Sequence, residues 1–423
     1  MDVLDFITVL IILAATFLLI NKKVFKLPST IGMMIMALVL SLAITFGDVF
    51  SESFKQGVHE VMVEYDFSKV LFQYMLSFLL FAGALELDLR KLGEEWWTIF
   101  ILATTGVIVS TFVVGAGMYF LLPFIGIEIE FIYALLFGAL ISPTDPISVL
   151  AMIKKSNVSK NLEAKIAGES MFNDGIGVVV FLTILQVAQS GVSDGVDFTE
   201  VAILFGREVI GGLGLGSVIG FLGLRLLMGI DNEDTEIEVL VTLSMVLGGA
   251  SIASMLDVSG PLAMVVIGLF AGHRGRTKKL EHAAGPYVYK FWNLIDETMN
   301  AILFILIGMQ IIVISWSENS LVAAAIAVVM VLIGRFVSVG IPISLQRIRR
   351  KVPKYTIRIL TWSGLRGGIS VALALSLYQN AKAGTMEMET VDLIIVMTYC
   401  TALFTIIIQG LTVKKLFEKA SKV

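Results

Sequence analysis

Long apolar segments separated by short polar segments cover almost the whole chain. A helix needs about 20 apolar residues to cross the roughly 30 Å of hydrocarbon in a bilayer. Judged by that length, the pattern predicts an all-α polytopic membrane protein with about thirteen transmembrane helices. We expect these spans near residues 3–20, 28–46, 67–85, 96–122, 131–153, 163–187, 199–228, 236–255, 258–272, 293–315, 320–344, 357–378 and 389–411.

Basic residues are distributed unevenly among the segments that join these spans. Cytoplasmic segments of membrane proteins carry an excess of Lys and Arg. If the N-terminus lies outside, most of the 31 Lys and Arg fall on the inner side, whereas the outer loops carry only Lys55 and Lys382. The pattern therefore predicts a multi-pass plasma-membrane protein with its N-terminus outside and a short basic cytoplasmic tail at 412–423.

The composition supports this class and excludes several others. Hydrophobic residues make up 57% of the chain, charged residues 16%, and the mean hydropathy is +0.90. A soluble protein of this size needs a more polar surface. The single cysteine excludes a disulfide framework, and the three histidines lack metal-ligand spacing. We therefore expect one transmembrane domain in a lipid bilayer, with no cofactor and no nucleic-acid partner.

Two of the predicted spans are interrupted. Pro143 and Pro146 break the fifth, because proline removes a backbone donor and clashes with the preceding turn. The twelfth contains the glycine-rich segment 364–368. Interrupted spans at corresponding places in two halves are typical of transporters with inverted repeats. The expected division is a first repeat at about 3–187, a linking helix at about 199–228 and a second repeat at about 236–411.

Oxygen-bearing side chains gather at the first interruption and on the span that follows. Asp145 lies between the two prolines, and Ser170, Asn173 and Asp174 lie within little more than one helical turn. Hard cations prefer carboxylate, hydroxyl and carbonyl oxygens, and ionisable groups deep in a membrane are functional candidates. Asp174, Asn173, Ser170 and the interrupted Thr144-Asp145 segment could together supply such oxygens to a cation. Ser170 and Asn173 alone are equally compatible with simple helix–helix hydrogen bonding.

Several other charges lie in or near the spans. Arg366 is near the middle of its span and needs an anionic partner, for which Glu169 is the best candidate; this pair would orient the site. Arg335 is also mid-span, and a packing ion pair and a supporting transport role are equally plausible. Glu86 fits a solvated helix end, and the acidic pair 296–297 at the start of the tenth span is ambiguous.

Four motifs together resemble one known family. They are Ser-Pro-Thr-Asp-Pro (142–146), Glu-Ser-x-x-Asn-Asp (169–174), Ser-Gly-Pro-Leu-Ala (259–263) and Gly-Leu-Arg-Gly-Gly (364–368). Their order and depth resemble those of monovalent cation:proton antiporters of the sodium/proton exchanger type. The resemblance covers nearly the whole chain.

The resemblance implies a transporter rather than an enzyme. It suggests a thirteen-helix homodimer whose core domain moves like an elevator and exchanges Na⁺, or else Li⁺ or K⁺, for H⁺. Asp174 would be the shared cation and proton site, and the Asn173-Asp174 pair resembles the electroneutral branch, with one cation exchanged per proton. Many relatives carry Glu where this chain has Ala82, which leaves the cation preference open.

Two other functions share some of these features. An ion-coupled symporter of a small solute could use a related inverted-repeat fold, but it would need a larger polar cavity. An intramembrane aspartyl protease also uses two buried aspartates, but its Gly-x-Gly-Asp pattern is absent from this sequence.

Overall fold

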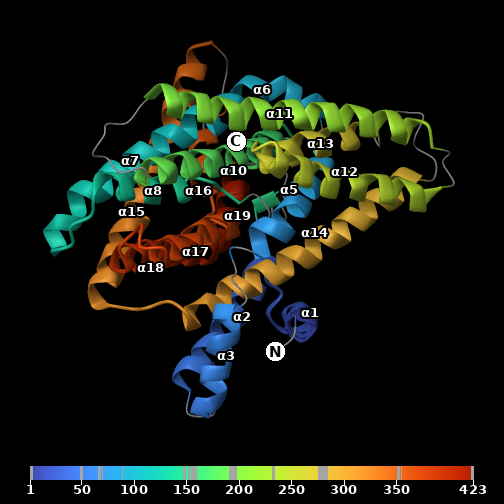
Figure 1. Cartoon of the computed structure of the whole chain (residues 1–423). Coiled ribbons are helices and arrows are strands. Elements are labelled where there is room, and N and C mark those ends of the chain that lie inside the picture. The colour runs from blue at the N-terminus through green and yellow to red at the C-terminus, as the bar shows by residue number, and fades with distance from the viewer. Residues whose placement is uncertain are drawn as a thin grey trace.

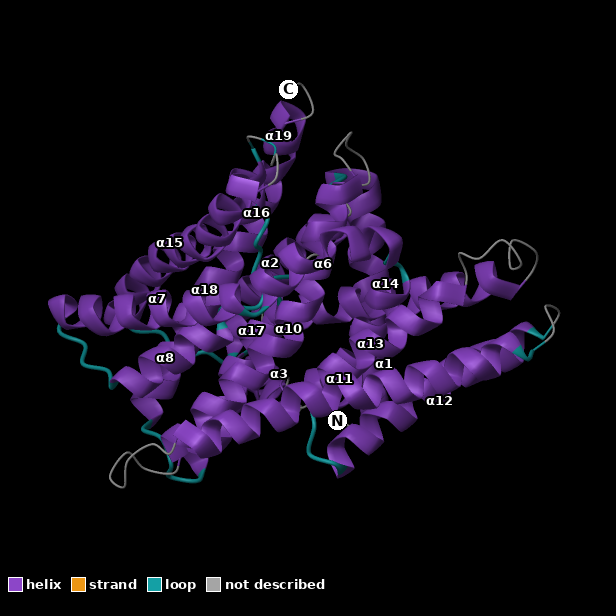
Figure 2. Cartoon of the chain, turned by 90° about the horizontal axis from the view of Figure 1, so that it is seen from above, coloured by secondary structure: helices purple, strands orange, loops and turns teal. Residues whose placement is uncertain are grey.

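The computed structural model describes residues 3–47, 51–64, 68, 70–87, 89–145, 149–150, 153, 160–189, 198–230, 234–274, 284–349, 353 and 355–420. These residues form helices and loops, with no strand among them (Figure 1, Figure 2). The helices are α1 (Val3–Ile20), α2 (Ser29–Phe46), α3 (Glu52–Glu64), α5 (Leu76–Leu85), α6 (Leu89–Ala103), α7 (Thr105–Leu121), α8 (Phe131–Leu140), α10 (Lys160–Gln189), α11 (Phe198–Met228), α12 (Thr235–Met255), α13 (Gly260–Arg274), α14 (Ala284–Met309), α15 (Glu318–Arg349), α16 (Thr356–Trp362), α17 (Gly368–Lys382), α18 (Met388–Phe404) and α19 (Gly410–Ala420). Short π-helical or 3-10 turns lie at Asn21–Phe25, Val70–Met75, Leu122–Ile125, Gln310–Ile312 and Thr405–Gln409.

Most of the predicted spans correspond to helices. Within the described ranges, nine helical stretches are long and apolar enough to cross a membrane, and three shorter apolar helices accompany them. The chain is thus a multi-pass helical membrane protein, whereas the count of thirteen stays a prediction. Some basic residues used to predict the orientation, and one proline of the first interruption, lie outside the described residues: Pro146, Lys154, Lys155, Arg276, Lys278, Lys279, Arg350, Lys351, Lys354 and Lys422.

Four segments differ from the hydrophobic pattern. The span predicted at 96–122 belongs to a longer helical stretch from Leu89 to Ile125, with α6 and α7 meeting at Thr104. Helix α14 starts well before residue 293, and α3 lies in a segment predicted to be a loop. The basic tail continues the last span as α19, with Val413 and Phe417 buried. These segments contain too many polar residues to be recognised as helices from the length of their apolar runs.

Both predicted interruptions are present, and they touch each other. Helix α8 ends at Leu140, and the chain then runs without helix through Asp145. The second break separates α16 from α17. The backbone N–H of Asp145 donates to the carbonyl of Leu365 at 2.8 Å, in an isolated antiparallel bridge. Each broken segment therefore satisfies part of the other's backbone, as non-helical chain within a membrane requires.

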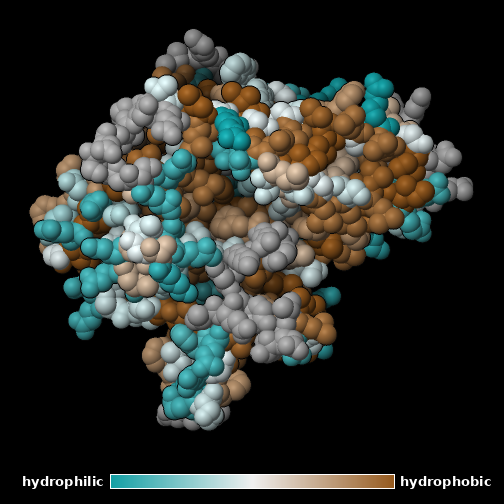
Figure 3. Space-filling view, viewed as in Figure 1, coloured by the Kyte–Doolittle hydropathy of each residue, from teal (hydrophilic) through white to brown (hydrophobic). Residues whose placement is uncertain are grey.

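The helices pack mainly within two groups. One contains α6, α7, α8, α10 and α15–α18, and the other contains α1, α2, α5 and α11–α14. In Figure 1 several members of the first group (α7, α8, α15, α17 and α18) lie on the left. Glycines of α11 allow its close approach to α13. A Cβ at Gly212 would lie 2.6 Å from the carbonyl oxygen of Ser259, just before α13, and one at Gly216 would lie 2.7 Å from that of Ala263. Hydrophobic surface gathers over α11 and α12 in Figure 3. Ile210 of α11 and Met255 of α12 are among the exposed apolar residues of these helices.

Candidate functional site

Asn173 connects the first broken segment, which contains Thr144, to helix α10. Its Nδ2 donates to Thr144 Oγ1 and to Glu169 Oε1, both at 2.8 Å. Its Oδ1 accepts from the backbone N–H of Thr144 at 3.2 Å, and Thr144 Oγ1 also shares a 2.8 Å hydrogen bond with Ser170 Oγ. The amide replaces hydrogen bonds that the break removes, and it fixes the position of Thr144 against α10.

The buried carboxylate of Glu169 pairs with Arg335 of α15, so the predicted partner Arg366 is wrong. Arg335 Nη1 and Nη2 donate to the two carboxylate oxygens at 2.7 and 2.8 Å, the parallel geometry that favours arginine. The Nε of Arg335 donates to the carbonyl of Leu360 at 3.2 Å, which anchors α16 to the same pair. Both side chains are at most 8% exposed. Of the two functions considered for Arg335, the structure shows the ion pair.

Arg366 binds backbone rather than a carboxylate. Its Nη1 donates to the carbonyls of Ser142 and of Pro143, the latter at 3.0 Å. Pro146 lacks the N–H that a continuous helix would donate to the Ser142 carbonyl, and the fully buried Arg366 guanidinium supplies a donor to both carbonyls. The backbone N–H of Arg366 donates to Thr405 Oγ1 at 3.0 Å. Arg366 therefore holds the two breaks together, a role that depth in a span could not reveal.

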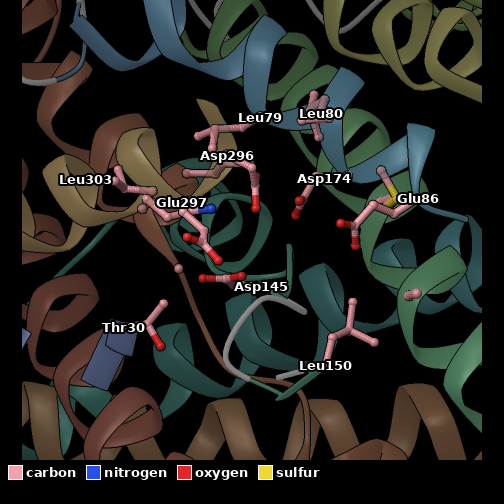
Figure 4. A pocket seen from close by; sticks show the side chains of 18 of the residues that line it. Thr30, Leu79, Leu80, Glu86, Asp145, Leu150, Asp174, Asp296, Glu297 and Leu303 are labelled. Atoms are coloured by element: carbon pink, nitrogen blue, oxygen red, sulfur yellow. The ribbon is translucent and has the colours of Figure 1, made fainter. Parts of the chain in front are cut away.

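Asp174 and Asp145 face a cavity of about 730 Å³ (Figure 4). They are 7% and 9% exposed. The carboxylate of Asp174 accepts no hydrogen bond from any residue that the structure describes, so its oxygens are available to an ion. Asp145 lies against the N-terminal end of α17, where a Cβ at Gly367 would come within 2.6 Å of the Asp145 Cβ. A helix N-terminus attracts negative charge. The other candidates, Thr144, Ser170 and Asn173, form the hydrogen-bonded layer behind this wall and do not line it.

Comparison with known proteins places the chain in a family. Residues 9–419 match the family described as "Sodium/hydrogen exchanger, transmembrane". The chain belongs to this family of transporters. It is 44% identical to the Na⁺/H⁺ antiporter NhaP of Pseudomonas aeruginosa, over 98% of this chain and 96% of that one. It is 31% identical to the Na⁺/H⁺ antiporter NhaH of Halobacillus dabanensis, over 98% and 97%.

The fold agrees with that of a solved antiporter structure. The structure of the sodium proton antiporter MjNhaP1 from Methanocaldococcus jannaschii at pH 8 matches with a TM-score of 0.76, over 99% of both chains at 18% identity. The resemblance drawn from the four motifs is therefore confirmed for the family, and the all-helical architecture agrees with it.

In this exchanger-family chain, the cavity also contains acidic residues to which the sequence assigned no role. Asp296 of α14 lines it together with Glu86 and Glu297, and Figure 4 shows their carboxylates near those of the two site aspartates. Asn293, Asp296 and Asn300 recur at intervals of three and four residues, which places them on one face of α14. This spacing was the available signal. From the sequence, the acidic residues were considered only as charges near the ends of helices, and for that reason they were not placed on a cavity wall.

Proposed function

We propose that this chain exchanges Na⁺ for H⁺ across the plasma membrane, with both ions using the carboxylate of Asp174. The observation that supports this most directly is the difference between Asp174 and its neighbours. Glu169 and Asn173 are held by hydrogen bonds, whereas the Asp174 carboxylate faces the cavity without one from the described residues. The relatives named Na⁺/H⁺ antiporters match over nearly the whole chain.

The mechanism is competition for one group. A carboxylate on the wall of a water-filled cavity holds either a proton or a cation, and its charge is neutralised in both cases. Glu169 is neutralised by Arg335 and takes no part in the exchange. Asn173 carries no charge at the position beside Asp174. One titrating group then gives one cation per proton, and the exchange is electroneutral.

The cation would be bound by the carboxylate oxygens of Asp174 and Asp145 on the cavity wall. The hydroxyl oxygens of Ser170 and Thr144 lie in the layer just behind them and would support the site from there. Carboxylate and hydroxyl oxygens are suitable ligands for a hard cation such as Na⁺. Li⁺ and K⁺ would compete for the same set according to size, and Ala82 on the cavity wall adds no ligand.

The cavity faces inward in the proposed orientation. Lys91 and Lys160 line it, and the charge pattern puts both on the cytoplasmic side. The opposite side is tightly packed just beyond Asp174 on α10. A Cβ at Gly175 would lie 2.6 Å from Leu262, and one at Gly177 would overlap Pro143. Access therefore alternates when the group of helices around α10 moves against the group around α13, the elevator-like step.

Helix packing supports the inverted repeats expected for such a step. If the repeats are equivalent, each span of the first repeat corresponds to the span seven places later in the second, so that α2 corresponds to α13 and α5 to α14. The α2–α14 contact then has the equivalent contact α13–α5, and both are present. In the same way α10–α6 is matched by α18–α15 and α10–α8 by α18–α17, while α7–α15 and α5–α14 each join two equivalent spans; all of these contacts are present. We further propose that the apolar surface of α11 and α12 contributes to a homodimer interface.

Proton movement in proteoliposomes tests this function. Purified protein is reconstituted with an internal pH dye, and Na⁺, K⁺ or Li⁺ is added outside at equal concentration. We expect Na⁺ to drive proton efflux at a rate that stays the same when the membrane potential is clamped. A rate that changes with the potential would contradict the one-to-one exchange. Transport of a solute with Na⁺ but without proton movement would contradict the antiport itself.

A further inference from the structure

A second cavity lies away from the cation site, between α15, α16 and α19. It has a volume of about 390 Å³. Phe336, Trp362 and Leu416 form its apolar wall, and Phe336 is 56% exposed. Trp362 Nε1 donates to Thr412 Oγ1 at 2.9 Å, which fixes the indole between α16 and α19. The groove is therefore built by side chains from three helices, and the hydrogen bond holds one of them, the indole of Trp362, in place.

Among the residues that the structure describes, the charges that line this groove are two cations. Arg358 is on α16 and Lys415 is on α19, and both are exposed at the rim. Neither forms an ion pair or a hydrogen bond with a residue that the structure describes. The neighbouring Lys414, by contrast, lies 3.9 Å from Glu418. Inside the groove, the buried hydroxyl of Thr361 also lacks a partner among the described residues.

Polarity changes along the groove in the way it changes along a phospholipid. The predicted orientation puts Arg358 and Lys415 at the cytoplasmic surface, where anionic lipids are concentrated. Trp362 follows one helical turn deeper than Arg358, and tryptophan is enriched at the membrane interface. On the same helix as Phe336, α15, the apolar side chains of Ile333 and Ile341 are also exposed. A ligand that fits has an anionic head and an apolar tail.

We propose that this groove binds an anionic phospholipid of the cytoplasmic leaflet. Its phosphate lies between Arg358 and Lys415, and an acyl chain lies against Phe336 and Leu416. The lipid then covers the outer side of α16, the helix whose Leu360 carbonyl accepts from Arg335. Bound lipid is thereby linked to the buried ion pair behind the cation site, and it stabilises the folded protein.

Lipid titration followed by native mass spectrometry tests the site. Delipidated protein in detergent receives phosphatidylglycerol, phosphatidylcholine or sodium phosphate, and the bound fraction gives each dissociation constant. We expect phosphatidylglycerol to bind more tightly than the other two. In the double variant Arg358→Gln/Lys415→Gln its dissociation constant should rise about thirtyfold, which is about 2 kcal/mol at 1.4 kcal/mol per tenfold. Phe336→Ala should weaken phosphatidylglycerol while leaving phosphate unchanged.

A matched variant controls for overall surface charge. Lys22→Gln/Lys23→Gln removes the same charge on the predicted cytoplasmic side and lies outside the groove. It should leave phosphatidylglycerol binding unchanged, and the melting temperature of wild type and of this control should rise with added lipid. An equal loss in both double variants would overturn the proposal. Equal binding of phosphatidylcholine would also overturn it, as would phosphate binding as tight as lipid at the same two residues.

Discussion

The Glu169–Arg335 pair gives the sharpest prediction for the interior of this exchanger. Its oxygens and nitrogens are 2.7 and 2.8 Å apart and almost fully buried. Removing one partner from a buried pair costs about 3–5 kcal/mol, because the other charge stays without compensation. Two charges about 4 Å apart interact by about 4 kcal/mol at an effective dielectric constant of 20. We therefore expect Glu169→Gln and Arg335→Gln each to destabilise strongly, with a coupling energy of about 3–4 kcal/mol.

The assay is a double-mutant cycle on unfolding in mixed micelles, followed by tryptophan fluorescence. A second cycle with Glu169→Gln and Arg366→Gln is the control. Arg366 makes its hydrogen bonds to backbone carbonyls, so its coupling to Glu169 should be less than half as large. If the Arg366 cycle gave the larger coupling, the assignment of the ion pair would be refuted. The same conclusion would follow if Arg335→Gln unfolded like the wild type.

Three further predictions concern transport in proteoliposomes. Asp174→Asn should abolish Na⁺-driven proton efflux and Na⁺ binding together. The control Asp257→Asn, which removes an exposed ion pair with Arg207, should leave both unchanged. Residual coupled exchange in Asp174→Asn would move the carrier role to Asp145. At a pH where Asp174 is protonated in most molecules, the apparent KM for Na⁺ should rise about tenfold per unit decrease in pH while the maximal rate stays constant. A falling maximal rate at constant KM would contradict competition. Ala82→Glu should lower the apparent KM for Na⁺ by about fivefold or more, because a charge about 4 Å from the cation contributes at least about 1 kcal/mol. An unchanged KM would show that residue 82 lies too far from the ion.

The sequence predicted the features that depend on depth in the membrane. Apolar length located most helices, and the positions of Pro143 and Gly364–Gly368 located both breaks before any contact was known. Asp145 and Asp174 were predicted as site residues because charge at mid-span is costly. Hydrophobic length says nothing about the direction a side chain takes around a helix. For that reason Asp296 was not assigned to the cavity, and Thr144, Ser170 and Asn173 were not separated from its wall.

The choice between Arg335 and Arg366 depended on neighbours that are far apart in the sequence, yet the glycines of the second break contain part of the answer. A Cβ at Gly364 would lie 2.5 Å from Arg335 Nε, so that glycine makes room for the guanidinium that reaches Glu169. A Cβ at Gly367 would crowd Asp145, and one at Gly368 would lie 2.5 Å from Leu303. The motif was interpreted as a helix break with one buried charge. Its glycines also admit three separate neighbours, and one of those neighbours is the true partner of Glu169.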